Sequence, residues 1–200
     1  MFYAHSQRDR TVLPHDPFKA LIAPRPIGWI SSQSHAGAVN LAPYSFFNAF
    51  SSAPPILGFC SEGHKDSIAN IEETGEFTWS MATYELRQDM NRTAASLPRG
   101  TSEFEYAGLE TAASHLVAPP RVARSPAALE CKVTQILRLK NLNGEETSNY
   151  LVLGQVVGVY IEDAFIQNGQ FNTAQAAPIA RCGYADYAVA NAMFSIIRPQ

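Results

Sequence analysis

The clearest pattern of hydrophobic and polar positions lies late in the chain. Residues 129–137 alternate imperfectly between apolar and polar side chains, which is typical of a strand that buries one face. Residues 150–161 are rich in Val, Tyr, Leu and Ile, which favour strands. Asn143 and Gly144 stand between these segments and suit a tight hairpin turn. The pattern predicts a long antiparallel pair.

Three shorter strands are predicted nearer the N-terminus, at residues 27–32, 56–60 and 77–81. Pro24 and Pro26 precede the first of them and confine the chain to an extended entry. Turn-forming residues precede the other two. These short strands do not alternate with helices, which argues against a parallel βαβ sheet.

Helices are fewer. Residues 66–74 have apolar side chains at Ile68 and Ile71 and predict a short helix that stops at Gly75. Residues 84–97 carry an apolar stripe at spacings of four, four and three, which predicts a second helix, and residues 185–193 suggest a third. The whole pattern predicts a mainly β fold, a β-barrel with peripheral α-helices.

Composition narrows the function classes. With 200 residues, 46% of them hydrophobic, the chain suits one domain spanning residues 1–200 with one core. A formal charge of -3 gives no basic footprint for nucleic acid. The first ten residues carry charges where a signal peptide needs an apolar run, and no apolar stretch long enough for a membrane span follows. We therefore expect a cytoplasmic protein with neither a nucleic-acid nor a membrane partner.

Several well-known catalytic motifs are absent from the sequence. It contains no G-x-G-x-x-G, Walker, H-E-x-x-H or G-x-S-x-G motif. The five histidines are scattered, and none has the close spacing of a metal pair, so no metal site is expected. Three cysteines fit neither a disulfide framework nor a zinc site and are expected to be small buried side chains.

The most informative stretch begins at Ala23 and runs on to Phe50. It joins a rigid, proline-bounded entry to a strand that ends in Ser31 and Ser32, and then passes through Ser45 and Asn48 among aromatic residues. Flat apolar walls suit a planar ligand, and polar groups at the ends of loops suit a polar tail. The stretch therefore favours a nucleotide-like cofactor.

A second candidate segment is Lys65, Asp66 and Ser67, at the start of the predicted helix. Free N–H groups and the helix dipole favour a phosphate there, while Lys65 adds a charge and Ser67 a hydroxyl. An ordinary helix cap beside a solvated lysine explains the same residues, and helix caps are commoner than phosphate sites. The segment alone leaves both interpretations open.

The order of motifs resembles one known family. Residues 15–31 and 40–48, the Lys65 segment, Arg181-x-Gly183 with Tyr187, and the closing residues 197–199 are together similar to the flavin reductase-like, FMN-binding split-barrel family, in particular its flavoredoxin-type group. The resemblance spans nearly the whole chain. It implies a six-stranded Greek-key split β-barrel that forms a homodimer with FMN at the subunit interface.

The resemblance also assigns positions. It implies that Ser31 and Ser32 lie along the flavin and that Trp29 and Phe46 shape its ring pocket, although Trp29 suits the barrel core equally well. Around the ribityl phosphate it places the following residues: Ser45, Asn48, Lys65, Asp66 and Ser67. His64 and Arg181 are the candidates to touch the nicotinamide or the flavin edge, and an ordinary loop histidine and a salt-bridged arginine are equally good interpretations.

The leading hypothesis for function is an NAD(P)H-dependent flavin reductase. Hydride from NADH or NADPH would reduce FMN, and the electrons would pass to a redox partner such as a monooxygenase component, to oxygen or to a small substrate. Two alternatives remain open: a non-catalytic FMN-binding electron carrier or flavin store, and a dimeric interaction protein that has lost its cofactor.

Overall fold

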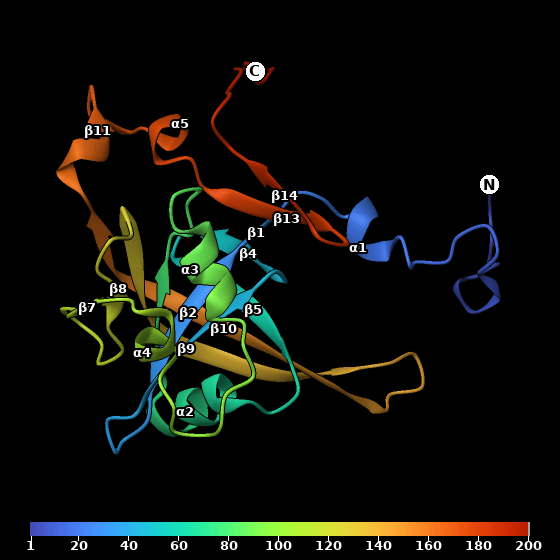
Figure 1. Cartoon of the computed structure of the whole chain (residues 1–200), viewed down its shortest axis with the longest axis horizontal. Helices are drawn as coiled ribbons and strands as arrows, with labels where there is room; N and C mark the ends of the chain where they lie inside the picture. Colours follow the sequence, from blue (N-terminus) through green and yellow to red (C-terminus); the bar gives the residue numbers. More distant parts are fainter. Residues whose placement is uncertain (200) are drawn as a thin grey trace.

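The computed structural model describes residues 1–199, and its main feature is a curled antiparallel sheet of seven strands (Figure 1). In spatial order the strands are β3 (Val39–Tyr44), β2 (Gly28–Gln33), β6 (Glu76–Ser80), β9 (Ala127–Lys140), β10 (Glu146–Ile161), β5 (Pro55–Glu62) and β4 (Phe47–Ser52). The mainly β architecture predicted from the sequence is confirmed. The expected number of six strands is not, because this sheet has seven.

The two edge strands of this sheet, β3 and β4, are neighbours along the chain. Only Ser45 and Phe46 separate them. Because an extended chain advances at most about 3.6 Å per residue, these two residues hold the adjoining ends of β3 and β4 within roughly 11 Å of each other. The sheet therefore has to curl until its edges approach, which produces a barrel with a seam at Ser45.

Strand β2 is buried on both faces. Ile30 points into the barrel, where it belongs to a cluster with Phe59 and Phe77. Trp29 points the opposite way, into a second cluster with Leu41 and Met90, because successive side chains of a strand face opposite sides. The barrel thus has an inner core and an outer core that share β2.

Helix α2 (Asp66–Thr74) closes one end of the barrel. Ile68 and Ile71 pack into the inner core, and Gly75 ends the helix in the left-handed conformation at φ +70°. The helix has the bounds expected from the sequence, since its apolar spacing and its terminal glycine are both local signals.

Helices α3 (Arg87–Arg92) and α4 (Glu103–Ala107) cover the outer core. The helix expected over residues 84–97 is therefore much shorter than predicted. The Thr93 hydroxyl donates to the Met90 carbonyl, and the Ala94 and Ala95 N–H groups bond carbonyls three residues back. These contacts tighten the last turn and end the helix.

A small sheet of β1 (Arg25–Pro26), β13 (Ile179–Gly183) and β14 (Asp186–Val189) lies beside the barrel. The prediction of a helix at residues 185–193 is wrong, because β14 pairs antiparallel with β13 and Val189 packs against the outer core. Pairing with a strand next to it overrides the weak helical pattern.

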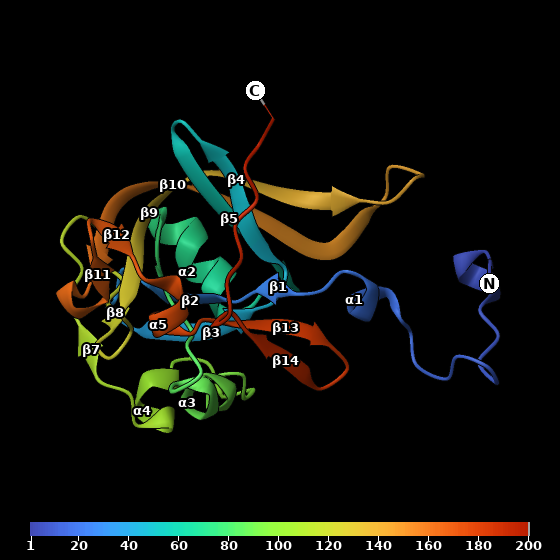
Figure 2. The ribbon, with the colours of Figure 1, turned by 90° about the horizontal axis from the view of Figure 1, so that it is seen from above.

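The predicted long pair is confirmed as the β9–β10 hairpin, which extends well beyond the barrel (Figure 2). Its turn contains Gly144 at φ +81°, and the Asn141 side chain accepts from two turn N–H groups.

The predicted strands at 27–32, 56–60 and 77–81 are also confirmed, as β2, β5 and β6. The remaining elements are η1 (His5–Gln7), α1 (Phe18–Leu21), β7 (Thr111–Ala112), β8 (Arg121–Val122), η2 (Asp163–Phe165), β11 (Ile166–Gln167), β12 (Gln170–Phe171) and α5 (Thr173–Ala176). Among residues 1–199, no helix is long and apolar enough to cross a membrane.

One buried hydrogen bond joins α3 to the barrel. The fully buried Trp29 indole N–H donates to the Thr93 hydroxyl at 2.9 Å. Replacing Thr93 by Val keeps the shape of the side chain and removes this acceptor. We expect Thr93→Val to lower the free energy of unfolding by about 1–3 kcal/mol, measured by urea unfolding. Thr93→Ser keeps the hydroxyl and should lose less. A Thr93→Val protein as stable as the wild type would contradict this role.

Candidate functional site

Two adjoining cavities lie at the seam of the barrel. The first, here the tyrosine cavity, measures about 430 Å³ and includes His15, Arg25, Arg181, Tyr184 and Tyr187 in its lining. The second, here the helix cavity, measures about 500 Å³ and lies at the start of α2. Both are lined by Lys19, Pro43, Ser45 and Ala94. The two cavities therefore meet where the chain crosses from one edge of the sheet to the other.

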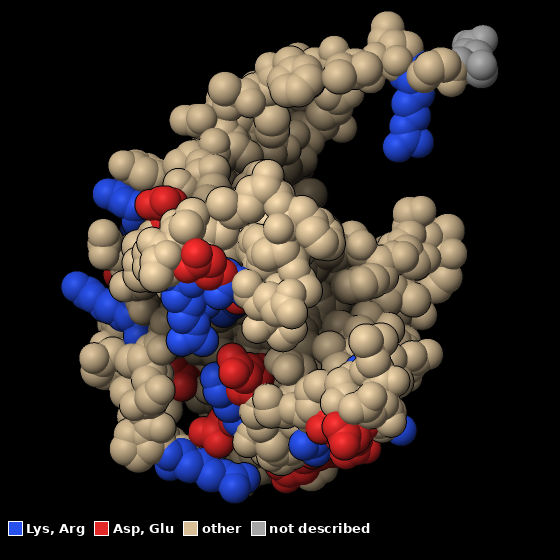
Figure 3. Space-filling model, turned by 90° about the vertical axis from the view of Figure 1, so that its right-hand side faces the viewer, with Lys and Arg blue, Asp and Glu red and all other residues tan. Residues whose placement is uncertain are grey.

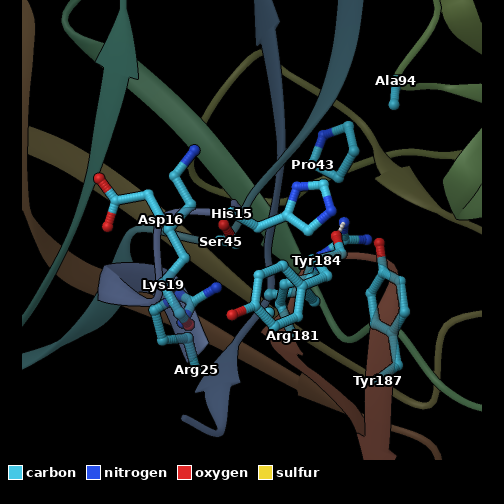
Figure 4. A pocket seen from close by; sticks show the side chains of 12 residues that line it. His15, Asp16, Lys19, Arg25, Pro43, Ser45, Ala94, Arg181, Tyr184 and Tyr187 are labelled. Atoms are coloured by element: carbon cyan, nitrogen blue, oxygen red, sulfur yellow. Dashed lines mark hydrogen bonds between the residues drawn. The ribbon is translucent and has the colours of Figure 1, made fainter. Parts of the chain in front are cut away.

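The tyrosine cavity combines flat rings with a cation (Figure 4). The rings of His15 and Tyr184 meet edge to face with their centroids 5.9 Å apart. The Arg181 guanidinium donates to the Tyr184 carbonyl and lies over the Tyr187 ring at 4.6 Å from its centroid. This arrangement suits a planar ligand that carries electron-rich oxygen or nitrogen atoms.

Arg25 fixes one wall of the tyrosine cavity. Its side chain is buried, and Nη1 donates to the carbonyl oxygens of Lys19 and Ile22 at the end of α1. Its Nε and Nη2 are buried and have no hydrogen-bond partner among the residues that the structure describes. Strand β1 pairs Arg25 with Arg181, so two guanidinium groups enter the cavity from adjacent strands.

The helix cavity is built around the start of α2. Lys65 occupies the N-cap position, and within the described chain no side chain caps the helix, so its first N–H groups are free for a ligand. Arg99 reaches the same cavity from the loop after α3 and lies 3.8 Å from the Asp66 carboxylate. Two cations and an uncapped helix start are the features of an anion site.

A buried carboxylate, Glu103, also lines the helix cavity. Glu103 Oε2 accepts from Asn40 Nδ2 and from the Leu41 backbone N–H, both at 2.9 Å. The side-chain oxygen Oδ1 of Asn40 in turn accepts from the Ser67 hydroxyl at 2.6 Å. Burial raises the pKa of Glu103 and the nearby Asp66 adds to this, while the hydrogen bonds from Leu41 and Asn40 oppose it. No pattern in the sequence points to Glu103 as a site residue.

Charges of both signs are interspersed on the face of the molecule shown in Figure 3. The lining of the helix cavity shows the same mixture. Its cations are Lys19, Lys65 and Arg99, and its carboxylates are Glu62, Asp66 and Glu103. Attraction for an anion therefore depends on where each charge stands and not on an excess of positive charge.

The structure brings together about half of the residues expected at the site. The helix cavity is lined by Ser45, Phe46, Lys65, Asp66 and Ser67. Arg181 lines the tyrosine cavity, close to Ser45. Segments that are far apart in the sequence thus converge on the seam.

Three expected residues lie elsewhere. Trp29, Ser31 and Ser32 are fully buried and line neither cavity. Trp29 donates to Thr93, Ser31 donates to the Pro120 carbonyl, and Ser32 accepts from Asn70 at 3.2 Å. The reason is that β2 lies in the middle of the barrel with elements packed on both of its faces.

Two further expected residues also line neither cavity. His64 Nε2 is 2.7 Å from the Glu72 carboxylate, and its ring packs edge to face against Tyr150. Asn48 is exposed on β4, where its side chain accepts from the Ala49 N–H. Among residues 1–199, no three His, Cys, Asp or Glu side chains gather where they could hold a metal ion.

Comparison with known proteins gives the same family as the motif order. The sequence matches the family described as flavin reductase like domain over residues 21–175. A protein of Halalkalibacterium halodurans is 34% identical over 184 residues, which cover 89% of this chain and 87% of that protein. Nitrilotriacetate monooxygenase component B from Bacillus cereus has a TM-score of 0.88 at 25% identity and covers 98% of each chain.

A further solved structure shows the same fold. A Shewanella frigidimarina protein named as a flavin reductase with a split barrel domain has a TM-score of 0.85 at 21% identity, and 100% of each chain is covered. The split-barrel fold expected from the resemblance is therefore confirmed. The chain belongs to the flavin reductase-like family, whose chemistry is flavin-related oxidation and reduction.

Proposed function

We propose that the chain binds FMN across the two joined cavities and acts as an NAD(P)H-dependent flavin reductase. One observation carries this proposal: an aromatic, cation-bearing cavity and an uncapped helix start with two cations meet at Ser45. Each cavity has the size of an ordinary small-molecule site, which is roughly 300–1,000 Å³. Together they match a ligand with a flat ring at one end and a phosphate at the other.

The residues present fit the two ends of FMN. At the helix cavity, the free N–H groups of α2, Lys65 and Arg99 would hold the phosphate. At the tyrosine cavity, Tyr184 and Tyr187 would flank the ring system. A single helix start provides one phosphate site, which favours a mononucleotide over a dinucleotide.

Bound FMN would supply the hydride acceptor, so the protein needs to position the reactants and exclude water. Arg181 is held by the Tyr184 carbonyl and the Tyr187 ring, so its charge has a fixed place beside the ring site. We assign it the contact with the nicotinamide or with the flavin edge. His64 has no such role in this proposal, because Glu72 and Tyr150 hold it away from both cavities.

We further propose that two copies form a homodimer with FMN at their interface, as the family resemblance implies. Exposed apolar side chains support this: Leu142 at the tip of the β9–β10 hairpin, and Phe194 and Ile197 in the C-terminal tail, have little or no contact within the chain. Similarity to a monooxygenase component B favours a protein or small-molecule acceptor for the electrons.

The two alternatives make different demands on the site. An electron carrier would hold FMN in the same cavities without accepting hydride from NAD(P)H. An interaction protein without a cofactor does not require an uncapped helix start next to an aromatic cavity, because neither feature would bind a ligand. The second alternative is therefore the weaker one.

The phosphate end can be tested with two ligands. We expect the protein to stay yellow after incubation with FMN and dialysis. A Lys65→Ala, Arg99→Ala double variant should bind FMN at least about tenfold more weakly, because a hydrogen bond to a charged group contributes roughly 1.5–3 kcal/mol. Its affinity for riboflavin, which lacks the phosphate, should not change. Flavin fluorescence titration measures both.

A matched control removes the same charge elsewhere. Lys132 and Arg124 are exposed, pair with Glu76 and Asp89, and line neither cavity. Lys132→Ala, Arg124→Ala should bind FMN like the wild type. Equal weakening of FMN and riboflavin by the Lys65 and Arg99 changes would refute the assignment of the phosphate.

The reductase activity is tested by anaerobic mixing with NADH or NADPH. The FMN-loaded protein should bleach within seconds, and Arg181→Ala should slow bleaching by about tenfold or more, as expected for the loss of one charge-assisted contact. Arg181→Lys keeps the charge and should recover part of the rate. If neither nicotinamide bleaches the flavin of the wild type, the electron-carrier alternative is favoured.

A further inference from the structure

The proposed function leaves one buried charge in the helix cavity without a role. Glu103, on α4, is only 7% exposed and faces the start of α2, where the phosphate would lie. A buried carboxylate is costly even when it is hydrogen-bonded, and an anionic ligand beside it raises that cost. Its position therefore bears directly on phosphate binding.

Glu103 also sets the direction of two hydrogen bonds. An ionised carboxylate only accepts, so the NH₂ group of Asn40 has to face Glu103 and the amide oxygen has to face Ser67. Ser67 then donates its single proton to Asn40. Its hydroxyl can offer only lone pairs to the cavity, and a phosphate oxygen offers the same. Ser67 thus helps to define this wall but donates no bond to a phosphate.

The charged groups around Glu103 come from several elements. Asp66 on α2 is the acidic neighbour that adds to the raised pKa of Glu103, and buried Tyr44 faces it from β3. The other charged side chains in the lining are Lys19, Glu62, Lys65 and Arg99. Helix α3 packs on α4, but none of its charged side chains is among the described residues that line the helix cavity. With three cations against three carboxylates, the lining has no positive excess for a phosphate dianion.

We propose that the helix cavity binds a phosphate ester together with a proton, and that Glu103 holds this proton. The inference rests on the proposed FMN site and deepens it. A neutral Glu103 leaves two carboxylates against three cations, which gives the lining a positive excess. The protonated acid keeps Oε2 as an acceptor for Asn40 and Leu41, so the wall of the cavity is preserved.

The coupling has a definite sign. A bound phosphate favours the protonated form of Glu103, so affinity falls as pH rises above the ordinary range of a glutamate and through its pKa in the complex. One coupled proton weakens binding by at most about tenfold per pH unit. The second ionisation of the phosphate, near pH 6, acts in the opposite direction, because the dianion is attracted more strongly to Lys65 and Arg99. A variant without the Glu103 charge separates the two effects.

The test compares Glu103→Gln with the wild type. Gln keeps an acceptor oxygen and removes the charge. FMN affinity is measured by flavin fluorescence from pH 5.5 to 8.5, and the ratio of the wild-type Kd to the variant Kd should grow with pH, by about tenfold or more over this range for one coupled proton. The same ratio for riboflavin should stay constant. Glu105→Gln, an exposed change on the same helix, should reproduce the wild-type profile.

Calorimetry of the wild type provides a second measurement that does not depend on the variant's folding. Titration at pH 8 in two buffers with different ionisation enthalpies gives the number of protons taken up, which should be larger for FMN than for riboflavin. A Kd ratio that is independent of pH, or equal uptake for both ligands, overturns this inference and leaves the FMN site intact. A wild type that binds neither ligand overturns the proposed function and this inference together.

Discussion

The rest of the structure depends on the two-residue connection between β3 and β4. Because Ser45 and Phe46 join the opposite edges of one sheet, the sheet cannot stay open, and its curl creates both the inner core and the seam. The cavities lie at this seam because the edge strands β3 and β4 are not paired with each other by backbone hydrogen bonds. Ser45 lines both cavities for the same reason. The site follows from how the sheet closes more than from any local motif.

What the sequence could predict follows from how local each signal is. The sequence predicts α2 with its observed bounds and the β9–β10 hairpin with strands that are two to four residues too short at three ends, because alternation, an Asn-Gly turn and a terminal glycine act within a few residues. The segment at β14 was predicted as a helix, because its strand conformation comes from pairing with β13. The early end of α3 depends on a threonine hydroxyl that bonds its own helix.

The residues of the candidate site also differ in whether a local sequence signal or tertiary packing places them there. Lys65 and Ser67 stand at a helix start that is visible in the sequence, and the order of motifs makes them candidates. Glu103 and Arg99 reach the cavity only through the packing of α4 and the loop after α3. The family resemblance, and not a local signal, implies that Ser31 lies beside the ligand. A single strand pattern does not reveal that both faces of β2 are covered, so its burial could not be foreseen.

The charges at the seam bear on how tightly a flavin can be held. Lys65 is exposed, so it would lose part of its hydration on binding a phosphate. Arg99 is paired with Asp66, so it would have to share or give up this partner. Ionised Glu103 would oppose a phosphate from a buried position, where its charge is screened least, and the proposed uptake of a proton removes this opposition. The N–H groups of α2 remain as the donors with no competing partner in the described chain. Recognition of a phosphate tail would therefore rely on these backbone donors together with the neutralisation of Glu103.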